Sequence, residues 1–166
     1  MKRLLLLVAP LLLLGADASE KLVKEVRHEL VMLPYYGIFD DLAYRVDGTK
    51  VTLFGAVTQP TLKSDAEKAI KKIEGVSHVD NQIEVLPVSS NDDTIRRAVY
   101  RAVFSKAGME RYQMGAVAPV HILVKNGNVT LVGFVTSEGD KNIAGIRANG
   151  VPGVFSVKNE LQVGHS

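Results

Sequence analysis

Apolar residues along the chain follow a helical period and then a strand period, and this order occurs twice. The helical positions, four residues apart, are Leu22, Val26 and Leu30 in the first half and Ile95, Val99 and Val103 in the second. Each set predicts an amphipathic helix. Pro34 ends the first predicted helix and Gly108 the second, which has capping candidates at residues 91–94.

A β-hairpin is predicted after each of these helices. Asp47-Gly48 and Asn126-Gly127 separate alternating segments, and such pairs tolerate the positive φ of tight hairpin turns. The apolar face of the second hairpin strand consists of Val51, Leu53 and Val57 in the first half and Val129, Leu131 and Val135 in the second. Gly55 and Gly133 fall on the same face, where we expect a crossing helix to approach closely.

A second helix is predicted next. In the first half its apolar stripe is Leu62, Ala66, Ala69, Ile70 and Ile73. Ser64-x-x-Glu67 and Ser137-x-x-Asp140 match capping boxes, although they are not in register with each other. In the second half Gly145 and Gly150 weaken the helical pattern.

A final strand closes each half. It follows Gly75 or Gly153 and carries Asn81 or Asn159 among inward-facing apolar residues. A buried amide needs hydrogen-bond partners, so we expect each asparagine to tie down a nearby loop or strand end. Ligand binding is the alternative role for these amides.

The two halves are copies of one unit. Sliding the first by 78 positions places residues 46–57 on residues 124–135, and the match continues without a gap over about 45 residues. The predicted fold class is α/β (α+β): two tandem α-β-β-α-β modules, each a three-stranded mixed sheet with two helices on one face. We expect the modules at 19–86 and 92–164, joined by a linker at 87–91.

The first 18 residues have the pattern of a secretory signal peptide. A basic start, Met1-Lys2-Arg3, precedes an apolar run from Leu4 to Leu14 and the small-x-small end Ala16-Asp17-Ala18. The run would span roughly 16 Å as a helix, against ~30 Å for a membrane core. We therefore expect cleavage after Ala18 and a periplasmic protein that is peripheral rather than transmembrane.

Composition argues against several functional classes. The formal net charge is +2, and it falls to about +1 without the predicted signal peptide, whereas nucleic-acid binders have a strong basic excess. The chain has no cysteine, so it has no disulfide, thiolate metal site or thiol nucleophile. We expect no nucleic-acid partner.

Candidate catalytic and metal-binding residues do not recur between the copies. The histidines are scattered at His28, His78, His121 and His165. Asp40-Asp41 would suit acid–base chemistry, but the second copy has Ala118-Pro119 there, which favours a solvated loop. We therefore predict no catalytic residue, no metal and no cofactor.

The motif V-T-L-x-G-x-V followed by G-V-x-x-V-x-N-x-[IL]-x-V occurs in both copies and resembles the BON domain. The resemblance covers nearly all of the chain after residue 18. It implies an α/β module of the bacterial envelope without catalytic residues, with a role in binding phospholipid surfaces and in envelope stress protection. The family's glycines and strand-end asparagine map onto Gly55, Gly75, Asn81, Gly133, Gly153 and Asn159. The second copy departs from the first by about five extra residues around 112–119.

Two groups of basic residues are the best candidates for a lipid-binding surface. The second helix of the first copy carries Lys63, Lys68, Lys71 and Lys72, and the first helix of the second copy carries Arg96, Arg97, Arg101 and Lys106. Anionic lipid surfaces attract such clusters, while an ordinary solvated helix face is the alternative. Arg97 and Arg101 share a helical face, and Tyr100 on its flank would suit a headgroup interface.

The sheet face away from the helices is a second candidate surface. It is predicted to carry Phe54, Ala56, Val132 and Phe134. Apolar residues of this kind indicate an interface, either with a partner or between the two modules. The expected partner is thus an anionic phospholipid surface. The alternative is an envelope protein, in which case the chain would act as a protein-interaction or chaperone-like module in an envelope assembly.

Overall fold

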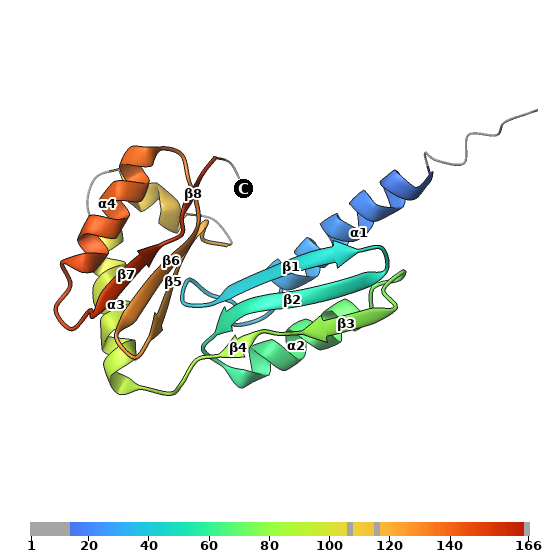
Figure 1. Ribbon diagram of the computed structural model, residues 1–166, viewed down its shortest axis with the longest axis horizontal. Helices are drawn as coiled ribbons and strands as arrows, with labels where there is room; N and C mark the ends of the chain where they lie inside the picture. Colours follow the sequence, from blue (N-terminus) through green and yellow to red (C-terminus); the bar gives the residue numbers. More distant parts are fainter. Residues whose placement is uncertain (1–13, 106–107, 115–116, 165–166) are drawn as a thin grey trace, which may run out of the picture.

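The computed structural model describes residues 14–105, 108–114 and 117–164, which form two α-β modules joined end to end (Figure 1). The predicted fold class is confirmed. Most of the predicted signal peptide, together with Lys106 and His165, lies outside the described residues.

Both modules have the predicted order of elements. The first contains α1 (Leu14–Val31), β1 (Asp41–Asp47), β2 (Lys50–Val57), α2 (Pro60–Lys71), β3 (His78–Asn81) and β4 (Glu84–Val85). The second contains α3 (Ser90–Phe104), a short 3-10 helix η1 (Glu110–Gln113), β5 (Val120–Lys125), β6 (Asn128–Val135), α4 (Glu138–Asn149), β7 (Ser156–Asn159) and β8 (Gln162–Val163). η1 lies at the start of the segment in which the second copy is longer than the first.

The second hairpin strand is central in each sheet. β2 is antiparallel to β1 and parallel to both β3 and β4, and β6 has the same relation to β5, β7 and β8. The predicted final strand is therefore divided into two short pieces. The amide of Gln82 between the pieces still donates to Leu53 O at 2.8 Å, so the pieces form one interrupted edge strand.

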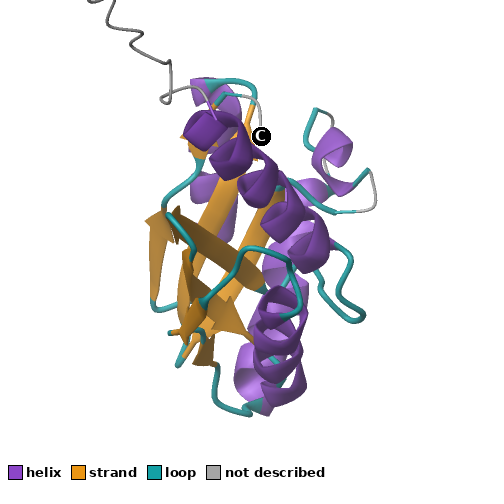
Figure 2. Ribbon diagram, turned by 90° about the vertical axis from the view of Figure 1, so that its right-hand side faces the viewer, coloured by secondary structure: helices purple, strands orange, loops and turns teal. Residues whose placement is uncertain are grey.

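The helices of each module lie together on one side of its sheet (Figure 2), and each module has its own apolar core. Val26, Leu53 and Ile70 bring α1, β2 and α2 together in the first core, and all three are fully buried. The predicted helical and strand stripes thus form the contacts between the helices and the sheet.

The starts of the helices differ in part from the predicted caps. α2 begins at Pro60, whose fixed φ suits a first helical position, and Ser64 lies inside the helix with its hydroxyl donating to Thr61 O at 2.9 Å. The capping box proposed at Ser64 is therefore wrong. Ser137 does cap α4 and accepts from the amide of Asp140 at 3.1 Å.

The sequence analysis predicts that the two glycines of the central strands face a crossing helix, and this prediction is wrong. Gly55 and Gly133 have φ of 107° and 113°, in the region that side chains rarely adopt. A Cβ there would collide with the backbone carbonyl of Asp41 or Pro119. The close neighbour is thus the chain at the start of β1 or β5, because the positive φ changes the direction in which the Cβ would point.

Candidate functional site

The loop between α1 and β1 contacts the second module and holds the two modules together. The amide of Ile122 in β5 donates to Ile38 O at 2.8 Å, so the loop continues the second sheet beyond its edge strand. The rings of Tyr36 and His121 stack with centroids 5.4 Å apart, and His121 Nδ1 lies 3.2 Å from Gly37 O. Phe39 also packs edge-on against Tyr100 of α3. These contacts bury His121 in the seam between the modules.

The buried His121 makes stability depend on pH. Burial lowers its pKa below the ordinary 6.5, although Asp41, Asp40 and Gly37 O act in the opposite direction. The unfolded chain therefore takes up the proton first, and stability is lost as the pH falls below 6.5. Burial raises the pKa of Asp41 above its ordinary value of 3.8. The folded chain therefore takes up this proton first, so the aspartate adds stability as the pH falls towards 3.8 and opposes the effect of the histidine. The phenol ring of Tyr36, which stacks on the imidazole of His121, is a further titratable group beside the histidine.

We expect His121→Phe, which keeps an aromatic ring against Tyr36, to reduce this loss of stability. Urea melts of parent and variant at about pH 7.5 and about pH 5.5 measure it, because the ordinary pKa of histidine lies within that interval and the variant lacks this one imidazole. The parent should lose more stability than the variant on acidification. Equal losses would show that the histidine has the same proton affinity folded and unfolded.

The outer sheet faces are partly covered by the neighbouring module. Ala56 is only 8% exposed, and it shares a groove with Leu123 and Thr130 of the second sheet. Phe134 lines another groove with residues of α1 and β1. Phe54 remains 38% exposed. Ala56 and Phe134 of this predicted apolar face therefore belong to the contact between the modules, whereas Phe54 does not.

The turn after each central strand is held by a side chain from the preceding loop. In the first module Asp40 accepts from the amide and the hydroxyl of Thr58, at 2.6 and 2.8 Å. In the second module the amide of Thr136 donates to the hydroxyl of Tyr112 at 2.9 Å. Asp40 is buried and used in this way, so it is not an open carboxylate for acid–base chemistry.

Tyr112 is the centre of a polar cluster in the second module. Its hydroxyl donates to Asp140 Oδ2 at 2.9 Å, and Arg111 donates to the same oxygen at 2.6 Å. Burial acts to raise the pKa of Asp140, but hydrogen bonds from Ser137 and Tyr112 and the charge of Arg111 outweigh it and lower the pKa. The cluster fixes η1 against the start of α4.

The two asparagines tie a helix to a strand break. Asn81 Nδ2 donates to Lys63 O at 3.0 Å, and Asn159 Nδ2 donates to Lys141 O at 2.7 Å. Their side-chain oxygens accept from the amides of Ile83 and Leu161. Both amide groups are thus occupied by the fold in the way the structural interpretation predicts.

The lysines on α2 are partly neutralised by their own helix. Lys68 pairs with Asp65 at 3.2 Å and Lys71 with Glu67 at 2.5 Å. Lys72 is exposed at the end of this helix. The surface of α2 is therefore mixed in charge rather than uniformly basic.

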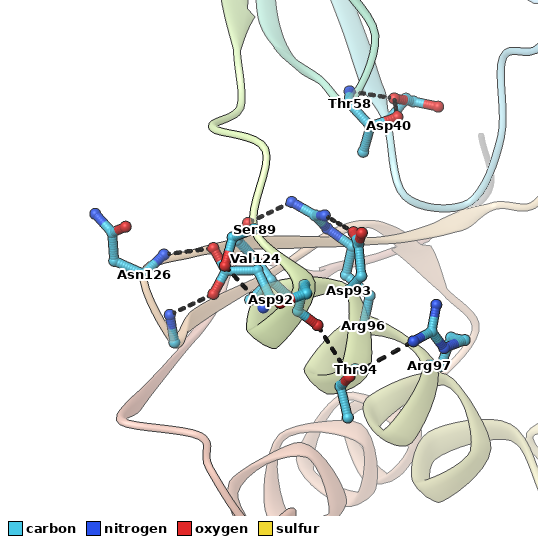
Figure 3. Close-up of polar contacts among 12 residues, drawn as sticks. Asp40, Thr58, Ser89, Asp92, Asp93, Thr94, Arg96, Arg97, Val124 and Asn126 are labelled. Atoms are coloured by element: carbon cyan, nitrogen blue, oxygen red, sulfur yellow. Dashed lines mark hydrogen bonds and ion pairs between the residues drawn. The ribbon is translucent and has the colours of Figure 1, made fainter.

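Arg96 does not belong to the exposed basic set on α3, which corrects the sequence-based prediction. It is only 4% exposed, pairs with Asp93 and donates to Val124 O at 2.8 Å (Figure 3). Asp92, one helical turn earlier, accepts from the amides of Asn126 and Gly127 at 2.8 and 2.9 Å. Both side chains face the β5–β6 hairpin and attach α3 to it.

Arg97 and Arg101 remain exposed on the opposite side of α3. Among the residues that the structure describes, neither guanidinium forms an ion pair; Arg97 has a long contact of 3.5 Å with the hydroxyl of Thr94 (Figure 3). Tyr100 turns towards the seam, where its hydroxyl donates to Gln113 at 2.9 Å. The free positive charge of α3 is therefore carried by the two arginines.

Metal-binding clusters and membrane-spanning helices are both absent from the residues that the structure describes. No group of three or more His, Asp or Glu side chains lies close enough to hold a metal ion in that part of the chain. Within the same residues, no helix has the length and apolar character of a membrane span.

Comparison with solved structures finds weak similarity to CdsD, described as the structural protein of the Type III secretion system of Chlamydia trachomatis. Its C-terminal domain is 12% identical, with a TM-score of 0.36, and the match covers 87% of this chain and 98% of that one. A second CdsD structure is 13% identical, with a TM-score of 0.32, and the match covers 87% and 94%. No curated protein matches the chain.

A family model gives the stronger comparison. The model of the BON domain matches residues 20–87 and again residues 91–165. BON domains are membrane- or phospholipid-associated modules and are not a catalytic family. With both matches spanning nearly the whole described chain, the protein belongs to the BON domain family and carries two copies in tandem.

Proposed function

We propose that this chain is a non-enzymatic, periplasmic protein that binds anionic phospholipid surfaces peripherally and contributes to envelope stress protection. The binding surface is the exposed face of α3, and the observation that carries the proposal is the pair Arg97 and Arg101. The pair lies four residues apart on one helix face, without a carboxylate partner among the described residues.

The environment of these arginines supports an electrostatic contact with a membrane. The acidic residues of the same helix are used elsewhere, since Asp92 binds the hairpin and Asp93 pairs with the buried Arg96. Each exposed cation near an anionic surface contributes about 1 kcal/mol. The lysines of α2 are weaker candidates because Lys68 and Lys71 already have carboxylate partners.

The position of α1 is compatible with the export that we propose. The helix extends from Leu14 to Val31, so cleavage after Ala18 would remove its first residues. The core positions that the structure describes in this helix, Leu22, Val26 and Leu30, all follow the cleavage point. The mature chain would therefore keep these three core residues of α1.

Vesicle flotation tests the proposed function. Arg97→Ala combined with Arg101→Ala should weaken binding to anionic phosphatidylglycerol vesicles about 30-fold, since two charges of ~1 kcal/mol are lost. Neutral phosphatidylcholine vesicles should bind neither protein. Salt should weaken the parent in the same way, because exposed charges are screened beyond ~8 Å at physiological ionic strength.

Lys68→Ala with Lys71→Ala is the matched control, because it removes the same charge from a face where both lysines are paired. It should reduce flotation much less. Melting curves are needed for both double variants, since arginine stems also pack on apolar surface. If the folded arginine variant floats as well as the parent, α3 is not the membrane surface.

A protein partner is the alternative, and one observation favours it. Ile146 on α4 and Phe155 in the following turn are 72% and 84% exposed. Large exposed apolar side chains are typical of protein interfaces. Failure of the flotation test would leave this interaction or chaperone-like role as the better explanation.

A further inference from the structure

A groove of about 390 Å³ lies between α3 and the C-terminal end of α4. Its lining residues are Ala98, Arg101, Ala102, Ser105, Arg147, Gly150, Val151 and Pro152. The two helices thus bring together two arginines that are far apart in the sequence, and no carboxylate lines the groove.

Each arginine has donors available in the groove. Arg147 is half-buried and donates through one terminal nitrogen to Val103 O at 3.0 Å, which fixes its side chain and leaves its other donors for a ligand. Arg101 is exposed and forms no ion pair among the described residues. Ser105 adds a hydroxyl at the end of α3, where it is exposed.

Three of the residues that line the groove are small. Ala98 and Ala102 present only methyl groups from α3, and Gly150 presents no side chain from the end of α4. These residues add no bulk to the groove that the two arginines line. Guanidinium groups bind phosphate oxygens through charge-assisted, frequently bidentate hydrogen bonds.

The first module offers an internal comparison, because equivalent positions can be read directly from the repeat. The buried stripe of α3 matches that of α1 at a shift of 73, and α4 matches α2 at a shift of 78. At these shifts Ala98 corresponds to Glu25, Ala102 to Glu29 and Pro152 to Glu74.

The two arginines have no counterpart in the first module. Arg101 corresponds to His28, and Arg147 corresponds to Ala69. The groove of the second module therefore carries two positive charges, whereas the equivalent positions of the first module include three glutamates and one lysine, Lys72. The fold alone does not require this groove to be cationic, since the same fold exists with the opposite charge.

We propose that the groove between α3 and α4 binds the phosphate group of a phosphate ester, held between Arg101 and Arg147. The assignment of that ester to a phospholipid headgroup rests on the proposed function, and it places the headgroup beside the membrane-facing Arg97. A soluble phosphate ester is the other source of the same chemistry. The first module has no such site.

An NMR titration of the purified protein with glycerol phosphate, at constant ionic strength, tests the groove without any membrane. Amide signals of residues 101–105 and 147–152 should shift and saturate. Arg101→Ala and Arg147→Gln should each weaken binding about tenfold, because each removes charge-assisted hydrogen bonds. Arg97→Ala, which is outside the groove, should leave the titration unchanged.

A second variant leaves Arg147 and its hydrogen bond to Val103 O in place. Pro152→Glu introduces the residue that the first module has at this turn, so the backbone is compatible with it. It should abolish the saturable shifts by placing a carboxylate in the groove. Asn142→Glu is the matched control, because it adds the same charge at an exposed position of α4 that does not line the groove.

The outcomes separate this inference from the proposed function. Absence of saturable shifts, or shifts unchanged by Pro152→Glu, overturns the groove even if the protein floats with anionic vesicles. Groove binding together with a loss of flotation in Arg147→Gln supports a lipid headgroup. Groove binding in a protein that does not float supports a soluble ester and overturns only the membrane function.

Discussion

Gly133→Val is expected to destabilise the protein by about 3 kcal/mol or more, and Gly55→Val by a similar amount. Both positions have strongly positive φ, which a β-branched residue tolerates poorly. The new Cβ would also collide with the backbone carbonyl of Pro119 or Asp41, which cannot move without separating the paired strands. Urea melts followed by circular dichroism measure the loss.

Gly139→Ala is the control for this prediction. Gly139 lies in the first turn of α4, has no positive φ, and leaves ordinary room for a Cβ. Alanine there should be neutral or stabilise by up to about 1 kcal/mol. An unchanged urea midpoint for both valine variants would mean that the central strands do not make these close approaches.

Asp92→Ala should cost about 2–3 kcal/mol of stability. Its carboxylate, 1% exposed, accepts from two consecutive amides of the β5–β6 turn, and alanine would leave those amides without this partner. Asn91→Ala, at the exposed neighbouring position of α3, should change stability by less than about 0.5 kcal/mol.

The melting curves of both alanine variants decide this prediction. Asp92→Asn offers a further comparison, because its amide keeps one acceptor oxygen but turns donors towards donors. It should fall between the parent and Asp92→Ala. If Asp92→Ala melts with the parent, the hairpin turn is held by other contacts.

The helices and strands could be predicted because burial imposes a period on the sequence. Val26 and Leu53 lie in stripes that only one helix phase and one strand phase can bury. The repeat added the alignment of the two modules. The break after Asn81, which divides the final strand, could not be predicted, because alternation continues unchanged through it.

The candidate surface was only partly predictable. Arg97 and Arg101 are exposed as expected, whereas Arg96 is buried. A signal for this existed: Asp92 and Arg96 continue the spacing of the apolar stripe that includes Val99. Charged residues on a buried stripe indicate paired polar groups rather than a free surface.

Contacts between segments that are far apart in the chain have no comparable signal in the sequence. Nothing periodic marks Ile38 as the residue whose carbonyl accepts from β5, and the stacking of Tyr36 on His121 depends on how the modules meet. The groove of Arg101 and Arg147 likewise depends on the packing of two helices. Sequence alone describes each helix face but not which faces become neighbours.

The loop that follows α1 also covers part of the open edge of the second sheet. β5 is the edge of its sheet, and an uncovered edge is a template on which strands of other molecules can add. Ile38 occupies that place by accepting from Ile122. A second module separated from the first would expose this edge, so its solubility, and not only its stability, depends on the neighbour that precedes it.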